Sequence, residues 1–492
     1  MSCADIPSHS FPHSTPLCEL LGCQLPLVLA GMGGVARSDL VIAFTRAGGF
    51  GFLGMVREPV ELIEQEVRRV REQTLGRFGV NLIPAGTEPG LLQRQVQRCI
   101  ELDVPVVGLF WDVRREAIEP LLDAGIKVVH QVGSIAQAMA AQEAGVHALI
   151  AQGVEAGGHV YGRQTLESLL AQVLAVADIP VAAAGGIATG EAVAKVLSQG
   201  AQAAVLGTVM LATQESFAHP YHKQRLVEAG PQDTVLTEDF HINWPSHAAV
   251  RVLRNSVTRG ERGDPHAQPS RQVIGHEEER PIYQFSTDSP LRSMTGDFEA
   301  MALYAGLGCK HISRIPAAAD RMEEIMQQAR REWRRLHPPE TALSSPVCYA
   351  SQFERERDAD LIARLNELLE AERARVRVTV QTLAHVQDQA TRKLLEAVQQ
   401  DGVQWCVMLL HAIRSMGAQP SHRTGDFFQK AMAIAAVNER LVFLNRGQGW
   451  VEKKLREILP LVDDPTLSVN LKRMLDAHVE HLEKVNHYLA AR

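Results

Sequence analysis

The stretch G-V-E-A-G-G-H-V-Y-G, residues 153–162, places one histidine among four glycines. The apolar run ALIAQ (148–152) precedes it, so the glycines fall where a strand is expected to end. Gly157 and Gly158 allow the backbone to adopt a positive φ, or a ligand to come close. A neutral imidazole can accept a proton near neutral pH. His159 is therefore a candidate general base, although a histidine in an ordinary tight turn would have no such role.

Glycines, amides and a threonine hydroxyl stand at the ends of other apolar runs. The runs 25–31 and 180–186 lead into AGMGG and AAAGGIATG, and 203–209 contains VLGT. Asn81 and Gln131 end two more runs. Backbone N–H groups beside glycine can bind phosphate oxygens, and side-chain amides can bond a heteroaromatic edge. FMN fits this set, whereas the G-x-G-x-x-G fingerprint is absent from the expected strand–helix junction. We expect the cofactor to contact Met32, Asn81, Gln131, Gln152, Gly157, Gly185, Gly186, Leu206, Gly207 and Thr208.

A scaffold must bring these strand ends together. Apolar runs without alternation indicate strands that are buried on both faces of a parallel sheet. Helical patterns, such as 59–73 and 165–178, separate the runs. Eight such units predict a (β/α)8 TIM barrel, in which the carboxyl ends of the strands form the active site; a doubly wound open sheet would show the same alternation. The runs are 25–31, 49–55, 77–83, 104–110, 126–132, 148–154, 180–186 and 203–209.

The chain has 492 residues, which is too many for one core and predicts two or more domains. We expect the barrel domain over 16–336, with insertions in 212–330 and a last helix at 316–336. The segment 337–354 begins HPPETALSSP, and its Pro, Ser and Thr residues are typical of a linker. Residues 355–492 predict an all-α, antiparallel four-helix bundle. Its expected helices are 358–388, 391–416, 426–459 and 466–491.

This helical part resembles ferritin-like bundles. A di-iron site there needs Glu from two helices and Glu-x-x-His from the other two. Helix two has Asp401-x-x-Gln404 instead, so we expect no metal site. The expected roles are oligomerisation, partner docking or a vestigial bundle. Gly447 and Gly449 predict a kink or a break in the third helix. The remaining candidate ligands are Glu370, Glu372, Glu439, His478, Glu480 and His481.

Bulk properties exclude several classes of protein. The net charge of −7 argues against a general nucleic-acid binder, and no apolar run is long enough to span a membrane. The N-terminus lacks the basic and apolar regions of a secretory signal. Seven scattered cysteines without C-x-x-C indicate neither a disulfide framework nor a zinc site. We expect a cytoplasmic protein that acts on small molecules and forms a homo-oligomer through its bundle.

Segments AGMGGVA, GVNL, QGVEAGGH, AAGGIATG and VLGT, with the later DTVLTEDF and WP…RVLRN, resemble the nitronate monooxygenase family over about residues 20–330. The resemblance implies a (β/α)8 barrel, non-covalent FMN, and oxidation of alkyl nitronates by O2 to a carbonyl compound and nitrite. It makes His159 the catalytic histidine. It also implies that FMN is contacted by Asn81, Gln152, Gly157, Gly186, Gly207 and Thr208.

Two departures from the family pattern bear on substrate range. Gly31 precedes Met32 where the family often has Ala-Pro-Met, and Val160-Tyr161 follows His159 where it often has Arg-Gly. Our hypothesis is that His159 removes a proton from neutral nitroalkanes and orients the anion when the nitronate itself is supplied. Two alternatives are an FMN- and NADH-dependent enzyme similar to enoyl-acyl-carrier-protein reductases, which share a related E-A-G-G-H motif, and a non-catalytic flavin-binding protein.

Overall fold

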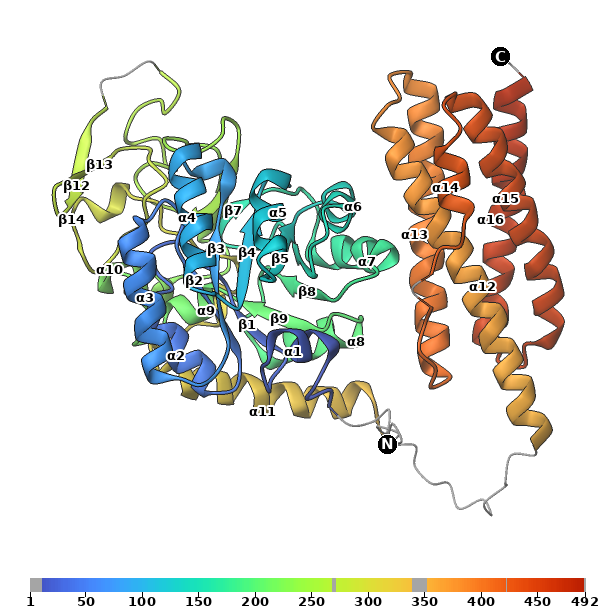
Figure 1. Cartoon of the computed structure of the whole chain (residues 1–492), viewed down its shortest axis with the longest axis horizontal. Helices are drawn as coiled ribbons and strands as arrows, with labels where there is room; N and C mark the ends of the chain where they lie inside the picture. Colours follow the sequence, from blue (N-terminus) through green and yellow to red (C-terminus); the bar gives the residue numbers. More distant parts are fainter. Residues whose placement is uncertain (1–10, 268–270, 339–351, 422, 491–492) are drawn as a thin grey trace. The chain divides into compact units, whose positions relative to one another are not determined.

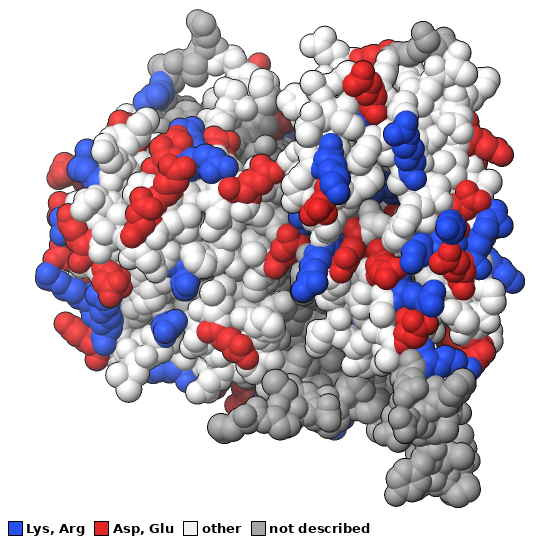
Figure 2. All heavy atoms as spheres, turned by 45° about the vertical axis from the view of Figure 1, so that its right-hand side comes forward, with Lys and Arg blue, Asp and Glu red and all other residues white. Residues whose placement is uncertain are grey.

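The computed structural model describes residues 11–267, 271–338, 352–421 and 423–490 (Figure 1). The chain divides into two compact units, a barrel unit and a helical unit. None of the described helices is both long and apolar enough to cross a membrane. On the face that Figure 2 shows, acidic and basic side chains are interspersed.

The barrel unit is built on a closed parallel barrel of eight strands. Neighbouring strands pair in parallel around the whole circle, and the barrel closes where Val28 of β1 faces Val205 of β9. Each strand lies within one of the eight predicted apolar runs, which confirms the predicted barrel and excludes the open sheet. The strands are β1 (Leu27–Leu29), β2 (Phe50–Gly54), β3 (Phe78–Leu82), β4 (Val106–Phe110), β5 (Lys127–Val132), β6 (Ala148–Gln152), β8 (Val181–Ala184) and β9 (Ala203–Leu206).

Helices surround the strands, and large apolar side chains fill the barrel interior. Phe50, Phe52 and Ile150 belong to one buried cluster that also contains Leu17 and Leu21 of α1 (Pro16–Leu21). Helix α1 therefore packs against the barrel core, away from the strand ends that carry the predicted site. The surrounding helices are α2 (Ser38–Arg46), α3 (Val60–Gln73), α4 (Pro89–Glu101), α5 (Arg115–Asp123), α6 (Ile135–Glu143), α7 (Leu166–Val176), α8 (Gly190–Ser198) and α11 (Ala318–Leu336).

The segment between β9 and α11, which the sequence showed only as an irregular insertion, forms two small antiparallel sheets with a core of their own. One sheet has the order β10-β11-β7. It includes β7, which leaves the barrel after β6 and carries His159 opposite Val250. This pairing anchors the insertion beside the carboxyl end of β6. The elements are β7 (Gly158–Val160), α9 (Thr208–Leu211), α10 (Pro220–Glu228), β10 (Thr234–Thr237), β11 (Ala249–Leu253), β12 (Val273–Glu277), β13 (Arg280–Tyr283) and β14 (Met294–Gly296).

The second unit is a bundle of helices, which confirms the predicted all-α architecture. Helix α12 begins within the range 337–354 that was expected to be the linker; of that range, residues 339–351 lie outside the described residues. The third expected helix, 426–459, is in fact two helices. The helices are α12 (Gln352–Leu383), α13 (Gln389–Ser415), α14 (Phe427–Met432), α15 (Val437–Ile458) and α16 (Pro465–Ala490).

The break in the third helix does not fall at its glycines. It falls at residues 433–436, where the Arg440 guanidinium donates to the Ile434 carbonyl at 2.6 and 3.1 Å and satisfies a group that the helix leaves open. Helix α15 runs unbroken through Gly447. A Cβ at Gly447 would lie 2.8 Å from Cζ of Phe427, so this glycine makes room for a ring of α14 rather than for a kink.

Candidate active site at the carboxyl ends of the barrel strands

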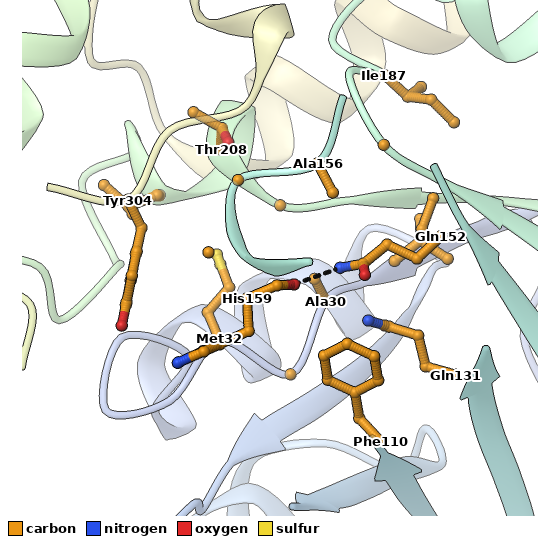
Figure 3. A pocket seen from close by; sticks show the side chains of 18 of the residues that line it. Ala30, Met32, Phe110, Gln131, Gln152, Ala156, His159, Ile187, Thr208 and Tyr304 are labelled. Atoms are coloured by element: carbon orange, nitrogen blue, oxygen red, sulfur yellow. Dashed lines mark hydrogen bonds between the residues drawn. The ribbon is translucent and has the colours of Figure 1, made fainter. Parts of the chain in front are cut away.

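A cavity of about 1080 Å3 opens at the carboxyl ends of the barrel strands (Figure 3). The predicted site residues meet there although they come from six strands, with one exception. Leu206 is fully buried in β9, opposite Leu29, and its carbonyl accepts from the Ala30 N–H at 3.0 Å. Leu206 therefore supports the barrel wall and does not line the cavity. The lining includes Met32, Asn81, Gln131, Gln152, Gly157, His159, Gly185, Gly186, Gly207 and Thr208.

The turn after β8 has a backbone that favours glycine. Gly185 and Gly186 have φ values of 124° and 68°, which side chains with a Cβ rarely adopt. The Thr208 hydroxyl oxygen accepts from the Gly306 N–H at 3.0 Å. Gly185 and Gly186 follow the seventh strand of the barrel and Thr208 follows the eighth, the positions where such barrels commonly bind phosphate.

Side-chain amides line another part of the cavity. The Gln152 amide donates from Nε2 to the His159 carbonyl at 3.0 Å, drawn as the dashed line in Figure 3. Its Oε1 is buried and has no hydrogen-bond partner among the described residues. Asn81 Nδ2 donates to the Gly31 carbonyl at 3.2 Å, and Gly31 leaves the space that the Asn81 side chain fills. A buried acceptor without a partner costs free energy, so Gln152 Oε1 fits a ligand that brings an N–H donor.

His159 is held by aromatic rings. Its imidazole stacks on Trp244 with ring centroids 3.4 Å apart, and Tyr304 lies 5.5 Å away. The buried Nε2 of His159 has no partner within the described chain. Burial, and to a lesser degree the positive charge of Arg57, hold the pKa of His159 well below its ordinary value. The imidazole is therefore neutral at pH 7, the state in which it can accept a proton.

Sequence reasoning missed the aromatic residues around His159. Trp244 belongs to the WP…RVLRN segment, one of the segments that carry the family resemblance. The resemblance assigned no role to this tryptophan, so its stacking on His159 was not predicted. Tyr304 gave no signal because it reaches the cavity only through the folding of the insertion. Its hydroxyl donates to the Thr287 carbonyl at 2.7 Å, and its own carbonyl lies 3.1 Å from Nε2 of His222. Burial lowers the pKa of His222 to about 4, so this histidine is a neutral structural group.

A second, larger cavity adjoins the first and encloses about 1720 Å3. His159 and Tyr304 line both cavities. Arg57 lines the second cavity, with Nη2 3.8 Å from an Asp288 oxygen; its φ of 60° is unusual for a residue other than glycine. Arg280 also contacts Asp288, at 3.0 Å. His159 thus lies between a glycine-lined cavity and a wider one in which two arginines are paired with acidic side chains.

The candidate metal ligands of the helical unit form separate pairs. His478 Nε2 lies 2.9 Å from Glu372 Oε1, and His481 Nε2 lies 3.1 Å from Asp401 Oδ2. Glu370 accepts from the Ser421 hydroxyl. Within the part of the chain that the structure describes, no three His, Cys, Asp or Glu side chains are grouped so as to hold a metal ion.

A closed eight-stranded parallel barrel with a cavity at the carboxyl ends of its strands is the architecture of the (β/α)8 enzymes. The chain belongs to the nitronate monooxygenase family: the family model described as "Nitronate monooxygenase" matches residues 14–90 and 85–328. This family makes it an oxidoreductase. A second model, "Domain of unknown function (DUF6306)", matches residues 359–487, which lie in the helical unit.

Three proteins that are similar to this chain carry different names. A nitroalkane oxidase from Streptomyces ansochromogenes is 31% identical, with a TM-score of 0.52 over 65% of this chain and 100% of that chain. FabK from Thermotoga maritima is 28% identical, with a TM-score of 0.56 over 66% and 98%. A (3aS,4S,5R,7aS)-5-hydroxy-7a-methyl-1-oxo-octahydro-1H-indene-4-carboxyl-CoA dehydrogenase from Rhodococcus jostii is 34% identical over 223 residues. That match spans 45% of this chain and 62% of the relative's length.

Proposed function

We propose that this protein is an FMN-dependent oxidoreductase that uses O2 to convert alkyl nitronates, and nitroalkanes after loss of a proton, to carbonyl compounds and nitrite. The observation that carries the proposal is the neutral imidazole of His159, whose Nε2 has no partner among the described residues and which lies between the two cavities. FMN, when bound, supplies the redox chemistry by taking electrons from the substrate and passing them to O2.

The residues of the first cavity fit FMN. Backbone at Gly186 and Gly207, with the Thr208 hydroxyl, is placed to hold a phosphate. Asn81 and Gln152 offer amides for the edge of a flat heteroaromatic ring, and the unpartnered Oε1 of Gln152 would gain a donor from it. The glycines at the strand ends carry no side chain, so a flat ligand can approach the backbone there.

His159 would remove the proton of a neutral nitroalkane. Nε2 accepts the proton from the carbon beside the nitro group, which leaves a nitronate anion and an imidazolium. Burial and Arg57 disfavour the imidazolium on its own. The nitronate forms in the same step with the opposite charge, so the two new charges stabilise each other at close range. When nitronate itself is supplied, this step is not needed.

The variant His159→Asn tests this role. We expect turnover of neutral nitroethane to fall by about 10²–10⁴-fold, because general bases typically contribute that much. Turnover of ethyl nitronate should fall far less, and the flavin absorbance of the purified variant should match wild type, which shows that the cofactor site is intact. Undiminished turnover of nitroethane would refute His159 as the base.

A second candidate function is a reductase or dehydrogenase that acts on a bulky acyl substrate. The second cavity is open to solvent and has room for a substrate longer than a small nitroalkane, and similar relatives include FabK and a dehydrogenase of a carboxyl-CoA compound. Anaerobic addition of NADH discriminates: rapid bleaching of the flavin bands supports this second function. Bound FMN with neither bleaching nor nitrite release would instead indicate a non-catalytic flavin-binding protein.

A further inference from the structure

The helical unit contains a cavity of its own, of about 1130 Å3. Helices α12 and α15 form its walls, with Thr424, Gly425 and Phe427. One part of the lining is aromatic and apolar: Phe427, Phe443 and Trp450, with Leu444 and Val451. Another part is polar and includes Glu372, Arg375 and Gln448. A large cavity with an apolar wall and a few convergent polar groups is the usual form of a small-molecule site.

The polar groups of this cavity are buried with unused hydrogen-bonding capacity. The Arg375 side chain is only 4% exposed, and Gly402 of α13 leaves the space into which its guanidinium packs. One of its nitrogens, Nη2, donates to the fully buried Glu372. Its Nε and Nη1 have no partner among the described residues, and neither has Oε1 of the buried Gln448. Unsatisfied groups of this kind call for a water, an ion or a ligand.

The carboxylates around the cavity are already paired. Glu372 accepts from Arg375 and lies 2.9 Å from His478 Nε2, and these charges hold its pKa below the usual range although burial alone would raise it. Glu370 accepts from the Ser421 hydroxyl, and Glu367 pairs with Lys454 at 2.9 Å. Among the buried charged groups that the structure describes in the cavity, the one with hydrogen-bond donors still unpaired is therefore the Arg375 guanidinium, a cation.

The exposed cation at the mouth of the cavity is Arg446, since the nearby Lys454 is paired with Glu367. Arg446 is exposed there, and the Lys454 ammonium lies 5.4 Å from the centre of the Trp450 ring, which is itself 43% exposed. An organic cation would compete with Lys454 for this ring and would find the carboxylates occupied. An organic anion would meet the exposed Arg446 at the mouth. Inside the cavity it would meet the Arg375 guanidinium, two of whose nitrogens have no acceptor among the described residues.

We propose that this cavity binds a small organic acid, a carboxylate on an aromatic or short alkyl body. The carboxylate oxygens supply the acceptors that the Arg375 guanidinium lacks, since carboxylates match that group best. The apolar body lies among Phe427, Phe443 and Trp450. This proposal does not depend on the reaction of the barrel, because every residue in it belongs to the helical unit.

Titration of the full-length, FMN-loaded protein tests the proposal, with benzoate and hexanoate as probes and heat as the readout. We expect saturable binding with a Kd of about 1 mM or tighter. Benzyl alcohol and benzylamine, which are neutral and cationic, should bind about tenfold more weakly because they lack the charge-assisted bond. Hydrogen exchange should slow over 367–375 and 443–451. Protection confined to barrel peptides, or benzylamine binding as tightly as benzoate, would overturn the proposal.

Two variants separate the polar and apolar contributions. Arg375→Lys keeps the charge beside Glu372 but loses the planar guanidinium, so affinity for benzoate should fall by about tenfold. Trp450→Ala changes an exposed side chain and should leave folding intact while it weakens benzoate more than acetate. Arg225→Lys, in the barrel unit, is the matched control and should leave the affinity for benzoate unchanged. If benzoate binds both cavity variants as tightly as wild type, or fails to bind wild type at all, the assignment is wrong.

Discussion

At the scale of single residues, the chemistry that we propose for the barrel site depends on the charge state of one imidazole, that of His159. His159 stacks on Trp244 and has a buried Nε2, and Arg57 adds positive charge on the side of the second cavity. Both effects keep the ring neutral. A base that is neutral at physiological pH is ready to act, whereas a protonated one would first have to lose its proton.

This arrangement predicts how the rate depends on pH. The base must be unprotonated, so kcat/KM for a neutral nitroalkane is lost as the pH falls through the pKa of His159. In the wild type that pKa lies below the ordinary value of about 6.5, so the plateau extends to lower pH. Arg57→Met removes a cation and should raise the pKa of His159, which moves the acid limb to higher pH. The acid limb of the pH profile is obtained by measuring kcat/KM for the neutral nitroalkane between about pH 4.5 and 8, in steps of about 0.5 pH units.

Arg57→Lys is the matched control, because it keeps a positive charge at the same position. Its acid limb should stay close to that of the wild type. If the methionine and lysine variants have the same acid limb as the wild type, the charge of Arg57 does not influence His159, and burial alone sets its pKa.

At the scale of elements, two glycines of α15 show how the same residue type can have opposite effects. A Cβ at Gly447 would meet the Phe427 ring at 2.8 Å, whereas a Cβ at Gly449 would have nothing within 4 Å. Both glycines lie inside one continuous helix. The difference between them is therefore one of packing against α14 and not of backbone conformation.

Alanine substitutions at these two positions should change stability in opposite directions. Gly449→Ala should stabilise the helical unit by about 0.5–1 kcal/mol, because alanine is the better helix former and has room. Gly447→Ala should destabilise it by about 1–3 kcal/mol, because the Phe427 ring must move. Hydrogen exchange of peptides within 437–458 in the full-length protein measures both. Equal stabilisation by both alanines would show that the Phe427 contact does not constrain α15.

At the scale of the whole molecule, the chain joins a barrel of the nitronate monooxygenase family to a helical unit that matches a domain of unknown function. The predicted FMN site lies entirely in the barrel, and the predicted acid site lies entirely in the helical unit. The two ligands should therefore be separable in one protein sample.

FMN added to flavin-free full-length protein should slow hydrogen exchange at the barrel mouth, in peptides that cover 153–160, 184–188 and 206–208. FMN stabilises the conformation that binds it and so suppresses local opening of the backbone. Protection from hydrogen exchange should therefore be largest in the peptides next to FMN. Peptides within 359–487 should exchange at unchanged rates. If FMN protects the helical peptides and not the barrel mouth, FMN binds the helical unit and the predicted site in the barrel is wrong.

The sequence alone determined the barrel and most of the residues that line the cavity at its strand ends. Strands such as 148–152 are buried on both faces and are therefore apolar up to their last residue, and the carboxyl ends of parallel strands must meet. Gln152, Gly186 and Thr208 could thus be placed together from the order of the apolar runs. The all-α character of residues 355–492 followed in the same way, from amphipathic periodicity.

Only the tertiary structure decided the rest, because it depends on contacts between distant segments. The ring stacked on His159 comes from Trp244, and β7 is held by β11, which lies some 90 residues further along the chain. Leu206 stands at a strand end, yet strand alternation turns its side chain away from the cavity. The helix break at 433–436 and the unpartnered nitrogens of Arg375 also depend on which side chains meet in the bundle. Periodicity states which face of an element is buried, but not which partner covers it.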